Sequence, residues 1–230
     1  MRSKHLVFVL AVALAPLAAR PDQAQPARAG ARQIDPVVIV GPPPAPSSDE
    51  AKADLAIVLW LQRTRSAADV ARAESEVKIR LDAFASALGP GFDPADHPRT
   101  RALLDRLHEQ ASAYVDEAKN RYRRPRPFVA DARVQPAVKR EGSPSYPSSH
   151  GARGILAARV LAELAPARRE ALLEIGRRLG YDRVVAGVHY PSDVLAGQRL
   201  GESLADTMLA DPDLRAEIAA IRAAEWTLSH

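Results

Sequence analysis

The segment from Pro98 to Tyr122 constrains the fold more than any other part of this 230-residue chain. Its apolar residues recur at spacings of three and four, at Leu104, Leu107, Ala111, Val115 and Ala118. This spacing places them on one face of an α-helix, and Pro125 ends the pattern. Only 5% of the residues are aromatic, while alanine and leucine recur throughout, which favours helices over sheets. We therefore predict an all-α fold.

The other helices are expected on both sides of this segment. Ser47-Ser48-Asp49-Glu50 fits a capping box and predicts a helix start near Ser47. A second helix is expected from near Ser66 to Gly89. Later helices are expected over about Ser149–Leu164, over Ala167–Leu179 with Gly180 as its end, from Pro191, and over Pro212–Trp226. With 47% hydrophobic residues, the chain can bury the core of a single compact domain, predicted to span residues 48–230.

The amino-terminal residues have the layout of an export signal. Arg2 and Lys4 precede an apolar run from Leu6 to Leu14, which predicts a signal peptide over residues 1–19. A proline-rich stretch over 20–47 is expected to be a flexible lead-in. We expect a periplasmic or secreted protein without an integral membrane segment after signal removal, although an uncleaved anchor is an alternative to the signal peptide.

The cysteine content and the net charge limit the crosslinks and partners that we expect for this chain. Cysteine is absent, so disulfides are excluded. The formal charge of +4 is small, and signal removal would reduce it, so we expect no nucleic-acid partner. Homo-oligomerisation stays open. Positive charge is concentrated in one cluster, which consists of Arg121, Arg123, Arg124 and Arg126.

Three short segments concentrate the residue types that phosphate chemistry needs. In the first, Lys119 at a helix end precedes Arg126 in a proline-flanked turn. An ammonium and a guanidinium group fixed in this way can bind phosphate oxygens. The alternative is a solvated basic helix end, which interacts favourably with the helix dipole.

The second segment is Tyr146-Pro147-Ser148-Ser149-His150, directly before a predicted helix. Free amides at a helix start can bind an anion, and the Ser148 hydroxyl can add a donor, with His150 close by. An ordinary serine N-cap beside an incidental histidine is the alternative.

The third segment runs from Arg183 to Asp193, with His189 between them. Asp193 in the first turn of a helix that begins at Pro191 can accept a hydrogen bond from one ring nitrogen of His189. The other nitrogen is then unprotonated and can act as a nucleophile. A buried histidine that is merely satisfied by a capping aspartate is the alternative.

Together the segments supply two histidines, an orienting carboxylate and at least three cations. Phosphoryl transfer needs neutralised oxygens, a nucleophile and an acid for the leaving group. Lys119-x6-Arg126-Pro127, Pro147-Ser148-Ser149-His150 and Arg183-x5-His189-x3-Asp193, in this order, resemble the three-part signature of the type 2 phosphatidic acid phosphatase superfamily. Bacterial class A non-specific acid phosphatases are its most similar branch.

The resemblance implies a helical domain of the acid phosphatase and vanadium haloperoxidase type. It implies that His189 attacks phosphorus, Asp193 orients it, and His150 protonates the leaving group of small phosphate esters. Phosphate would be bound by Lys119, Arg126, Ser148, Ser149 and Arg183, with no metal and no cofactor. The chain departs from the family pattern at Ser149, where glycine is usual, and at Asp182, where serine is usual.

Three other functions are compatible with these motifs. A vanadium-dependent haloperoxidase would use the same anion pocket, although such enzymes are generally larger. A lipid phosphate or pyrophosphate phosphatase would act at the membrane surface. A non-catalytic phosphate or nucleic-acid binder would use the basic cluster from Arg121 to Arg126, but it would not require the two histidines and the aspartate.

Overall fold

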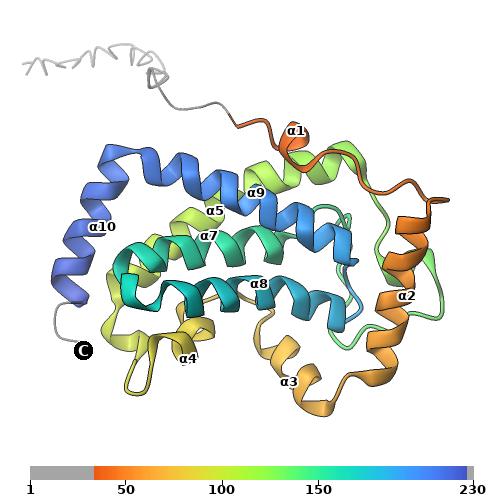
Figure 1. Ribbon diagram of the computed structural model, residues 1–230, viewed down its shortest axis with the longest axis horizontal. Coiled ribbons are helices and arrows are strands. Elements are labelled where there is room, and N and C mark those ends of the chain that lie inside the picture. The colour runs from red at the N-terminus through yellow and green to blue at the C-terminus, as the bar shows by residue number, and fades with distance from the viewer. Residues whose placement is uncertain (1–33, 227–230) are drawn as a thin grey trace, which may run out of the picture. The chain divides into compact units, whose positions relative to one another are not determined.

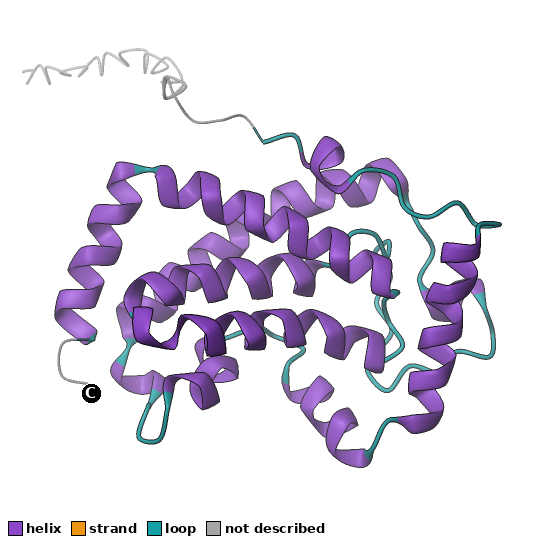
Figure 2. Ribbon diagram, viewed as in Figure 1, coloured by secondary structure: helices purple, strands orange, loops and turns teal. Residues whose placement is uncertain are grey.

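A computed structural model describes residues 34–226 of the chain. Within this range Figures 1 and 2 show helices joined by loops, and no strand occurs, which confirms the predicted all-α fold. The elements in chain order are α1 (Pro36–Val40), α2 (Asp49–Thr64), α3 (Ala67–Ser75), η1 (Leu81–Phe84), α4 (Ala85–Leu88), η2 (Pro94–Asp96), α5 (Pro98–Tyr122), α6 (Pro127–Ala130), α7 (Ser149–Leu164), η3 (Pro166–Arg168), α8 (Arg169–Val185), α9 (Pro191–Ala210) and α10 (Pro212–Glu225).

Helix α7 forms the centre of the core. It packs along α8 and α9 and contacts α5 and α10, as Figure 1 illustrates. Its apolar residues are buried on almost every side, as expected for a helix with neighbours all around it. The apolar face predicted for α5 contributes Leu104, Leu107 and Ala111, each at most 2% exposed. The core therefore fixes the start of α7 and the ends of α5 and α8 relative to one another.

Gly180 does not end its helix as the sequence suggested. Helix α8 continues to Val185, and Gly180 lies where α8 meets the starts of α7 and α9. A β-carbon at this position would lie 2.8 Å from Val194 Cγ1 and 3.1 Å from Gly151 Cα. The glycine therefore allows close helix packing, and Arg183 lies in the last turn of α8 rather than in a loop.

The single helix predicted from Ser66 to Gly89 is broken into α3, η1 and α4. Residues 76–80 between α3 and η1 form no helix. Ile79, Leu81 and Phe84 all turn into the core, with exposures of 9%, 2% and 0%. Spacings of two and three along one straight helix would not direct all three inward equally, so the chain changes its conformation.

Part of the proline-rich lead-in is folded against the domain. Val40 in α1 is 2% exposed, and its carbonyl accepts hydrogen bonds from Tyr146 Oη at 2.7 Å and Arg199 Nη2 at 3.0 Å. Residues 36–40 of the lead-in predicted over 20–47 thus form α1, whose buried residues Pro36 and Val40 pack against the domain. The predicted signal peptide, residues 1–19, and residues 20–33 lie outside the described residues.

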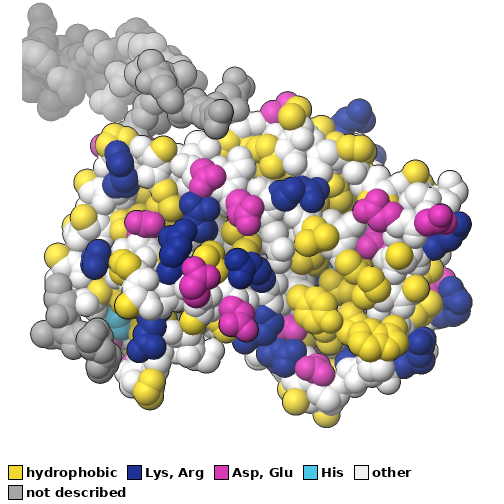
Figure 3. Space-filling view, viewed as in Figure 1, with side chains coloured by type: hydrophobic (Ala, Val, Ile, Leu, Met, Phe, Trp, Pro, Cys, Tyr) yellow, Lys and Arg dark blue, Asp and Glu magenta, His cyan; other side chains and the backbone are white. Residues whose placement is uncertain are grey.

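The outer face of the domain carries mixed charges and one apolar area. Figure 3 shows hydrophobic side chains gathered over α2 and the adjoining ends of α8 and α9. The large exposed hydrophobic residues on these helices are Ile57, Trp60, Tyr181 and Leu195. Within residues 34–226, no helix combines the length and the apolar character that crossing a membrane requires.

Candidate active site

The connection from α8 to α9 holds His189 in place. Gly187, with φ of +75°, turns the chain after α8, and Pro191 begins α9. Asp193 in the first turn of α9 lies with Oδ2 3.2 Å from His189 Nδ1 and accepts the Tyr190 amide at 2.9 Å. The predicted pairing of His189 with Asp193 is therefore present in the structure.

The partners of His189 define its tautomer. A carboxylate only accepts hydrogen bonds, so Nδ1 carries the proton and Nε2 is left unprotonated. Nε2 lies 3.3 Å from Arg126 Nη1. The ring is 2% exposed, and burial, together with the charge of Arg126, lowers the pKa of His189 to about 4 despite its hydrogen bond to Asp193. The histidine is therefore neutral over most of the acid range, and its Nε2 lone pair faces an N–H group of Arg126.

Asp193 has two further partners that sequence reasoning did not assign to the site. Arg124 Nη1 donates to Asp193 Oδ1 at 2.7 Å, and the Ser145 hydroxyl donates to Oδ2. Burial acts to raise the pKa of Asp193, but the bond to His189 and the charge of Arg124 hold it below its ordinary value. Arg124 also binds Asp54 Oδ2 at 2.9 Å. Arg124 could have been found from the sequence, because it belongs to the basic cluster. Ser145 belongs to none of the three motifs, so no sequence pattern pointed to it.

Every N–H group of Arg126 has a partner within the chain. Nε donates to Ser143 O at 2.8 Å, and Nη1 donates to Val188 O at 3.0 Å and faces His189. Nη2 donates to Ser143 Oγ at 3.0 Å and to Glu141 Oε2 at 2.6 Å. A guanidinium group has five N–H donors, so a phosphate oxygen can bind Arg126 only where one of these partners moves. The Glu141 side chain is 43% exposed, so its carboxylate can move into solvent when a phosphate oxygen binds.

Lys119 and Arg183 complete the set of predicted cations. Lys119 is 3% exposed and its ammonium donates to the carbonyls of Pro144 and Ser145. Burial, with the charge of Arg126, lowers the pKa of Lys119 to about 8. Arg183 is 1% exposed, and its Nη1 donates to Ala73 O at 2.9 Å. Its Nε is buried with no partner among the described residues, so this cation can still accept an anion.

The start of α7 supplies backbone donors, as predicted. Ser148 is the N-cap, and its Oγ accepts the Gly151 amide at 3.2 Å while its hydroxyl proton stays available. The amides of Ser149 and His150 occupy the first two helical positions, which lack partners inside the helix. Ser149 does not have a positive φ, so the β-carbon at the position where the family usually has glycine causes no backbone strain.

His150 is held by a backbone carbonyl. Its Nε2 lies 3.1 Å from Glu76 O, and because a carbonyl only accepts, Nε2 carries the proton. Nδ1 is therefore the nitrogen that can take up or release a proton. Burial and the charges of Arg183 and His189 lower the pKa of His150 to about 3. A bound phosphate would raise this pKa, since an opposite charge favours the protonated ring.

Asp182 points away from the phosphate-binding groups. It is fully buried and accepts two hydrogen bonds from Arg72, from Nε and from Nη2, each at 2.9 Å. Arg178 pairs with Glu76 Oε1 at 2.9 Å in the same region. The carboxylate that replaces the usual serine therefore fastens α3 to α8, next to the carbonyl of Ala73 that holds Arg183.

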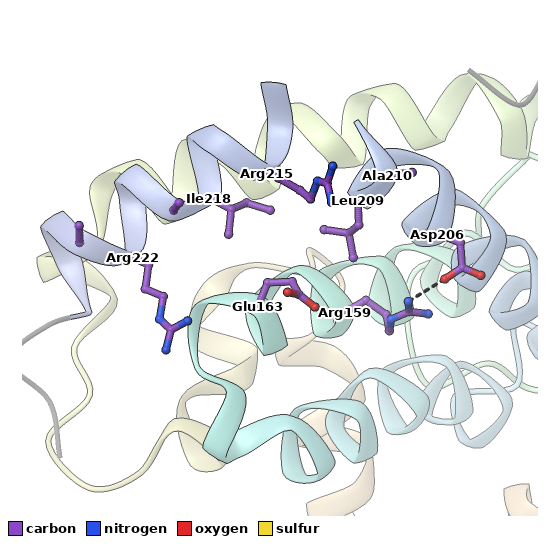
Figure 4. Close-up of a pocket in the computed structure, with 10 residues that line it drawn as sticks. Arg159, Glu163, Asp206, Leu209, Ala210, Arg215, Ile218 and Arg222 are labelled. Carbon is purple, nitrogen blue, oxygen red and sulfur yellow. Dashed lines mark hydrogen bonds and ion pairs between the residues drawn. The ribbon is translucent and has the colours of Figure 1, made fainter. Parts of the chain in front are cut away.

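Two cavities differ in their relation to these residues. One, of about 700 Å³, lies between α7, α9 and α10 and is lined by none of the site residues, as Figure 4 shows. Its wall includes the ion pair of Arg159 with Asp206 at 2.7 Å. A second cavity, of about 620 Å³, has His150 in its wall. Among residues 34–226 no group of three or more His, Asp or Glu side chains is arranged to hold a metal ion.

Comparisons with known proteins agree with this geometry. The family model of the PAP2 superfamily matches residues 110–213. The non-specific acid phosphatase of Salmonella typhimurium is 30% identical over 212 residues, which cover 87% of this chain and 84% of the relative. The acid phosphatase of Zymomonas mobilis is 30% identical over 210 residues, which cover 88% of this chain and 80% of the relative.

A solved structure shares the fold. It is the transmembrane PAP2 type phosphatidylglycerolphosphate phosphatase from Bacillus subtilis, which matches with a TM-score of 0.53 at 19% identity and covers 74% of this chain and 89% of that one. At this identity the match shows the fold alone. From the family model, the similarity to the acid phosphatases and the shared fold, it follows that this chain belongs to the PAP2 superfamily.

Proposed function

We propose that this chain is an acid phosphatase that hydrolyses phosphate monoesters through a phosphohistidine on His189. The observation that carries the proposal is the position of His189, whose Nδ1 is 3.2 Å from Asp193 and whose Nε2 is 3.3 Å from Arg126. A neutral imidazole with its lone pair beside a guanidinium group suits attack on a bound phosphorus. Two relatives over most of the chain are named acid phosphatases, which supports the same reaction.

In the first step, the lone pair of His189 Nε2 forms a bond to phosphorus and the phosphorus–oxygen bond to the leaving alcohol breaks. The leaving oxygen takes a proton from protonated His150, so the alcohol departs neutral. Asp193 stabilises the positive charge that develops on His189. In the second step, water attacks the phosphohistidine, gives a proton to His150, and releases inorganic phosphate from Nε2.

The chain's own cations neutralise the transferred phosphoryl group. Arg183 has an unpartnered buried Nε, Arg126 lies at the ring nitrogen of His189 that does not contact Asp193, and the charge of Lys119 also acts on His189. The amides of Ser149 and His150 and the hydroxyl of Ser148 add donors at the start of α7. We propose that these groups act without a metal ion, since fixed cations and amides can supply the electrostatic stabilisation themselves.

Arg124 and Arg126 of the basic cluster fit this role better than nucleic-acid binding. Arg124 has a side-chain exposure of 10% and Arg126 of 2%, and both are directed to carboxylates and carbonyls of the domain. Backbone phosphates of a nucleic acid would need exposed cations. We further propose that the protein acts in the periplasm or the medium, on the basis of its signal-like residues 1–19.

One observation favours a second candidate, a lipid phosphate phosphatase at a membrane surface. Trp60 and Tyr181 are 54% and 47% exposed on neighbouring helices, and aromatic side chains favour the membrane interface. Turnover of dispersed phosphatidic acid can be compared with turnover of para-nitrophenyl phosphate. A higher kcat/KM on the lipid, lost in Trp60→Ser, would favour the second candidate.

The experiment that tests the main proposal is hydrolysis of para-nitrophenyl phosphate by the purified protein from pH 4 to 7 with chelator present. We expect turnover that persists in chelator and is lost in His189→Ala. An alkaline denaturing quench during turnover should trap a phosphoryl group that is stable in base and labile in acid. Turnover without a trapped phosphohistidine, or turnover by His189→Ala, would contradict the mechanism.

A further inference from the structure

Of the predicted site residues, His150 is the one that lines the second cavity. This cavity measures about 620 Å³ and lies between residues 77–81, the first two turns of α5, and the face of α7 that carries His150 and Arg153. Residues three apart on a helix share a face, so these two side chains point to the same side of α7. His150 is the proposed acid for the leaving group, and the cavity in whose wall it lies is therefore the place for that group.

The charges in the wall of this cavity are strongly unbalanced. Four cations line it, Lys78, Arg80, Arg101 and Arg153, against the single carboxylate of Asp105. In the described part of the chain none of the four forms an ion pair. Four cations with one opposing carboxylate produce a positive field focused in a concave wall, which attracts anions.

Arg153 gives an independent indication that an anion binds here. Its Nη2 donates to Ser112 Oγ at 2.5 Å, but its Nε is buried and has no partner within residues 34–226. A half-buried guanidinium without a carboxylate partner and with a buried N–H carries a desolvation cost that a bound anion would offset. The unpartnered donor lies one helical turn from His150, at the junction of the phosphate site with the cavity.

We infer that this cavity receives the leaving group of the substrate and selects alcohols that carry a second phosphate group. The inference rests on the proposed function and names its substrate class. The phosphoryl group that is transferred goes to His189 Nε2, and the alcohol oxygen takes its proton from His150. The second phosphate stays on the departing alcohol, where Arg153 and the exposed cations Lys78, Arg80 and Arg101 bind its oxygens.

Binding of non-hydrolysable analogues tests the cavity without any turnover. Propane-1,3-diphosphonate and propylphosphonate differ by one phosphonate group, and calorimetry at 0.1 M salt measures their affinities. We expect the wild-type protein to bind the diphosphonate about tenfold more tightly, because two or three charge-assisted contacts are added. In Lys78→Gln/Arg101→Gln this ratio should fall to about twofold, while propylphosphonate affinity stays within about twofold.

Arg99→Gln is the matched control, since Arg99 lies two residues from Arg101 on the same exposed turn of α5 but does not line the cavity. Arg99→Gln should keep the wild-type ratio of the affinities for the diphosphonate and for propylphosphonate. Equal affinity of the wild-type protein for both analogues, or an equal loss of the ratio in Arg99→Gln, would overturn the inference.

Turnover of 1,3-propanediol bisphosphate and monophosphate on the same proteins separates this inference from the proposed function. A preference of about tenfold in kcat/KM for the bisphosphate, lost in the double variant, is the expected result. Turnover with no such preference overturns the inference and leaves the phosphatase proposal standing. A binding preference without turnover of any ester supports the anion cavity and overturns the phosphatase proposal.

Discussion

The carboxylate of Glu141 lies 2.6 Å from Arg126 through Oε2 and Nη2, at the arginine that also contacts the nucleophile His189. Because all five N–H groups of Arg126 are occupied, this carboxylate holds a donor that a phosphate oxygen would otherwise use. Its charge also acts on Lys119 and Arg183. Substrate must therefore displace Glu141 from Arg126 or share the donor with it.

We predict that Glu141→Gln binds phosphate esters more tightly than the wild-type protein. An amide retains the shape of the side chain but removes the negative charge that opposes the substrate. KM for para-nitrophenyl phosphate and the inhibition constant of inorganic phosphate should both fall about three- to tenfold. Steady-state kinetics with phosphate as the inhibitor measures both.

Asp131→Asn is the matched control for Glu141→Gln. Asp131 is a carboxylate of the same connection between α6 and α7 and lies 2.6 Å from its own arginine, Arg133, away from the site. The control should leave both constants within about twofold of the wild-type values, since an exposed pair contributes little. An unchanged inhibition constant in Glu141→Gln would show that the carboxylate does not compete with phosphate.

Asp193 sets the tautomer of His189, so its replacement should impair the chemical step. In Asp193→Asn the amide can donate to Nδ1, which moves the ring proton to Nε2 and removes the attacking lone pair. We predict that kcat falls by at least about a hundredfold while KM changes little. Asp206→Asn, on the same helix with an exposed carboxylate, should retain the wild-type kcat. A fall in KM without a fall in kcat would contradict this role for Asp193.

The sequence predicted the parts of this site that depend on local pattern. The apolar spacing of α5 and the proline that begins α9 predicted the helix ends on which Lys119 and Asp193 lie, and the predicted all-α fold and family are confirmed. The structure brings the eight predicted site residues into one region, and their individual roles stay predictions. Glu141 and Arg153 were not predicted, because their positions depend on how the connection 131–148 and the face of α7 meet other elements.

Gly180 and Val40 also show how packing between distant segments overrides local sequence pattern. Gly180 has the composition of a helix end, but its lack of a side chain serves helix packing instead. The prolines of the lead-in suggested flexibility, yet Val40 is buried by contacts with residues more than a hundred positions away. Local pattern does not encode such long-range contacts, whereas the tertiary structure displays them directly.

The pH dependence of catalysis should follow the neutral form of His189. Its pKa is lowered to about 4, and only the unprotonated ring can attack phosphorus. We therefore predict that kcat/KM shows no acid limb near the ordinary histidine pKa of 6.5. A pH–rate profile, measured with a substrate whose ionisation does not change across the range, shows the pH at which the acid limb of kcat/KM lies. An acid limb centred near pH 6.5 would contradict the pKa assigned to His189.

The folded protein should become less stable as the pH is lowered through the same range. Burial lowers the pKa values of His108 and His189 to about 4 and of His150 to about 3. Between pH 6.5 and about 4 the unfolded chain binds protons at these residues and the folded chain does not. The free energy of unfolding therefore falls as the pH is lowered, by about 1.4 kcal/mol per unit for each histidine.

Urea denaturation between pH 4.5 and 6.5 measures this slope. His108 lies outside the proposed catalytic groups and its Nε2 is buried without a partner among the described residues, so His108→Leu offers a clean comparison. The variant should lose the contribution of one histidine from the slope. A slope that is unchanged in His108→Leu would show that this histidine does not contribute to the acid sensitivity.

The ion pair of Asp182 with Arg72 joins α8 to the end of α3. Asp182 is fully buried, so Arg72→Gln leaves a carboxylate whose remaining cation, Arg178, is 3.6 Å away. We predict a loss of about 2 to 4 kcal/mol in the free energy of unfolding, with an increase in KM because the Ala73 carbonyl that holds Arg183 shifts.

The double variant Arg72→Gln/Asp182→Asn tests the cause of that loss. Removing both charges at once avoids an unpaired buried carboxylate, so the double variant should be more stable than Arg72→Gln by about 1 to 2 kcal/mol. Urea denaturation of the single and double variants gives the coupling energy. Additive losses would show that the two residues stabilise the fold independently, and that the aspartate in place of the usual serine does not rely on Arg72.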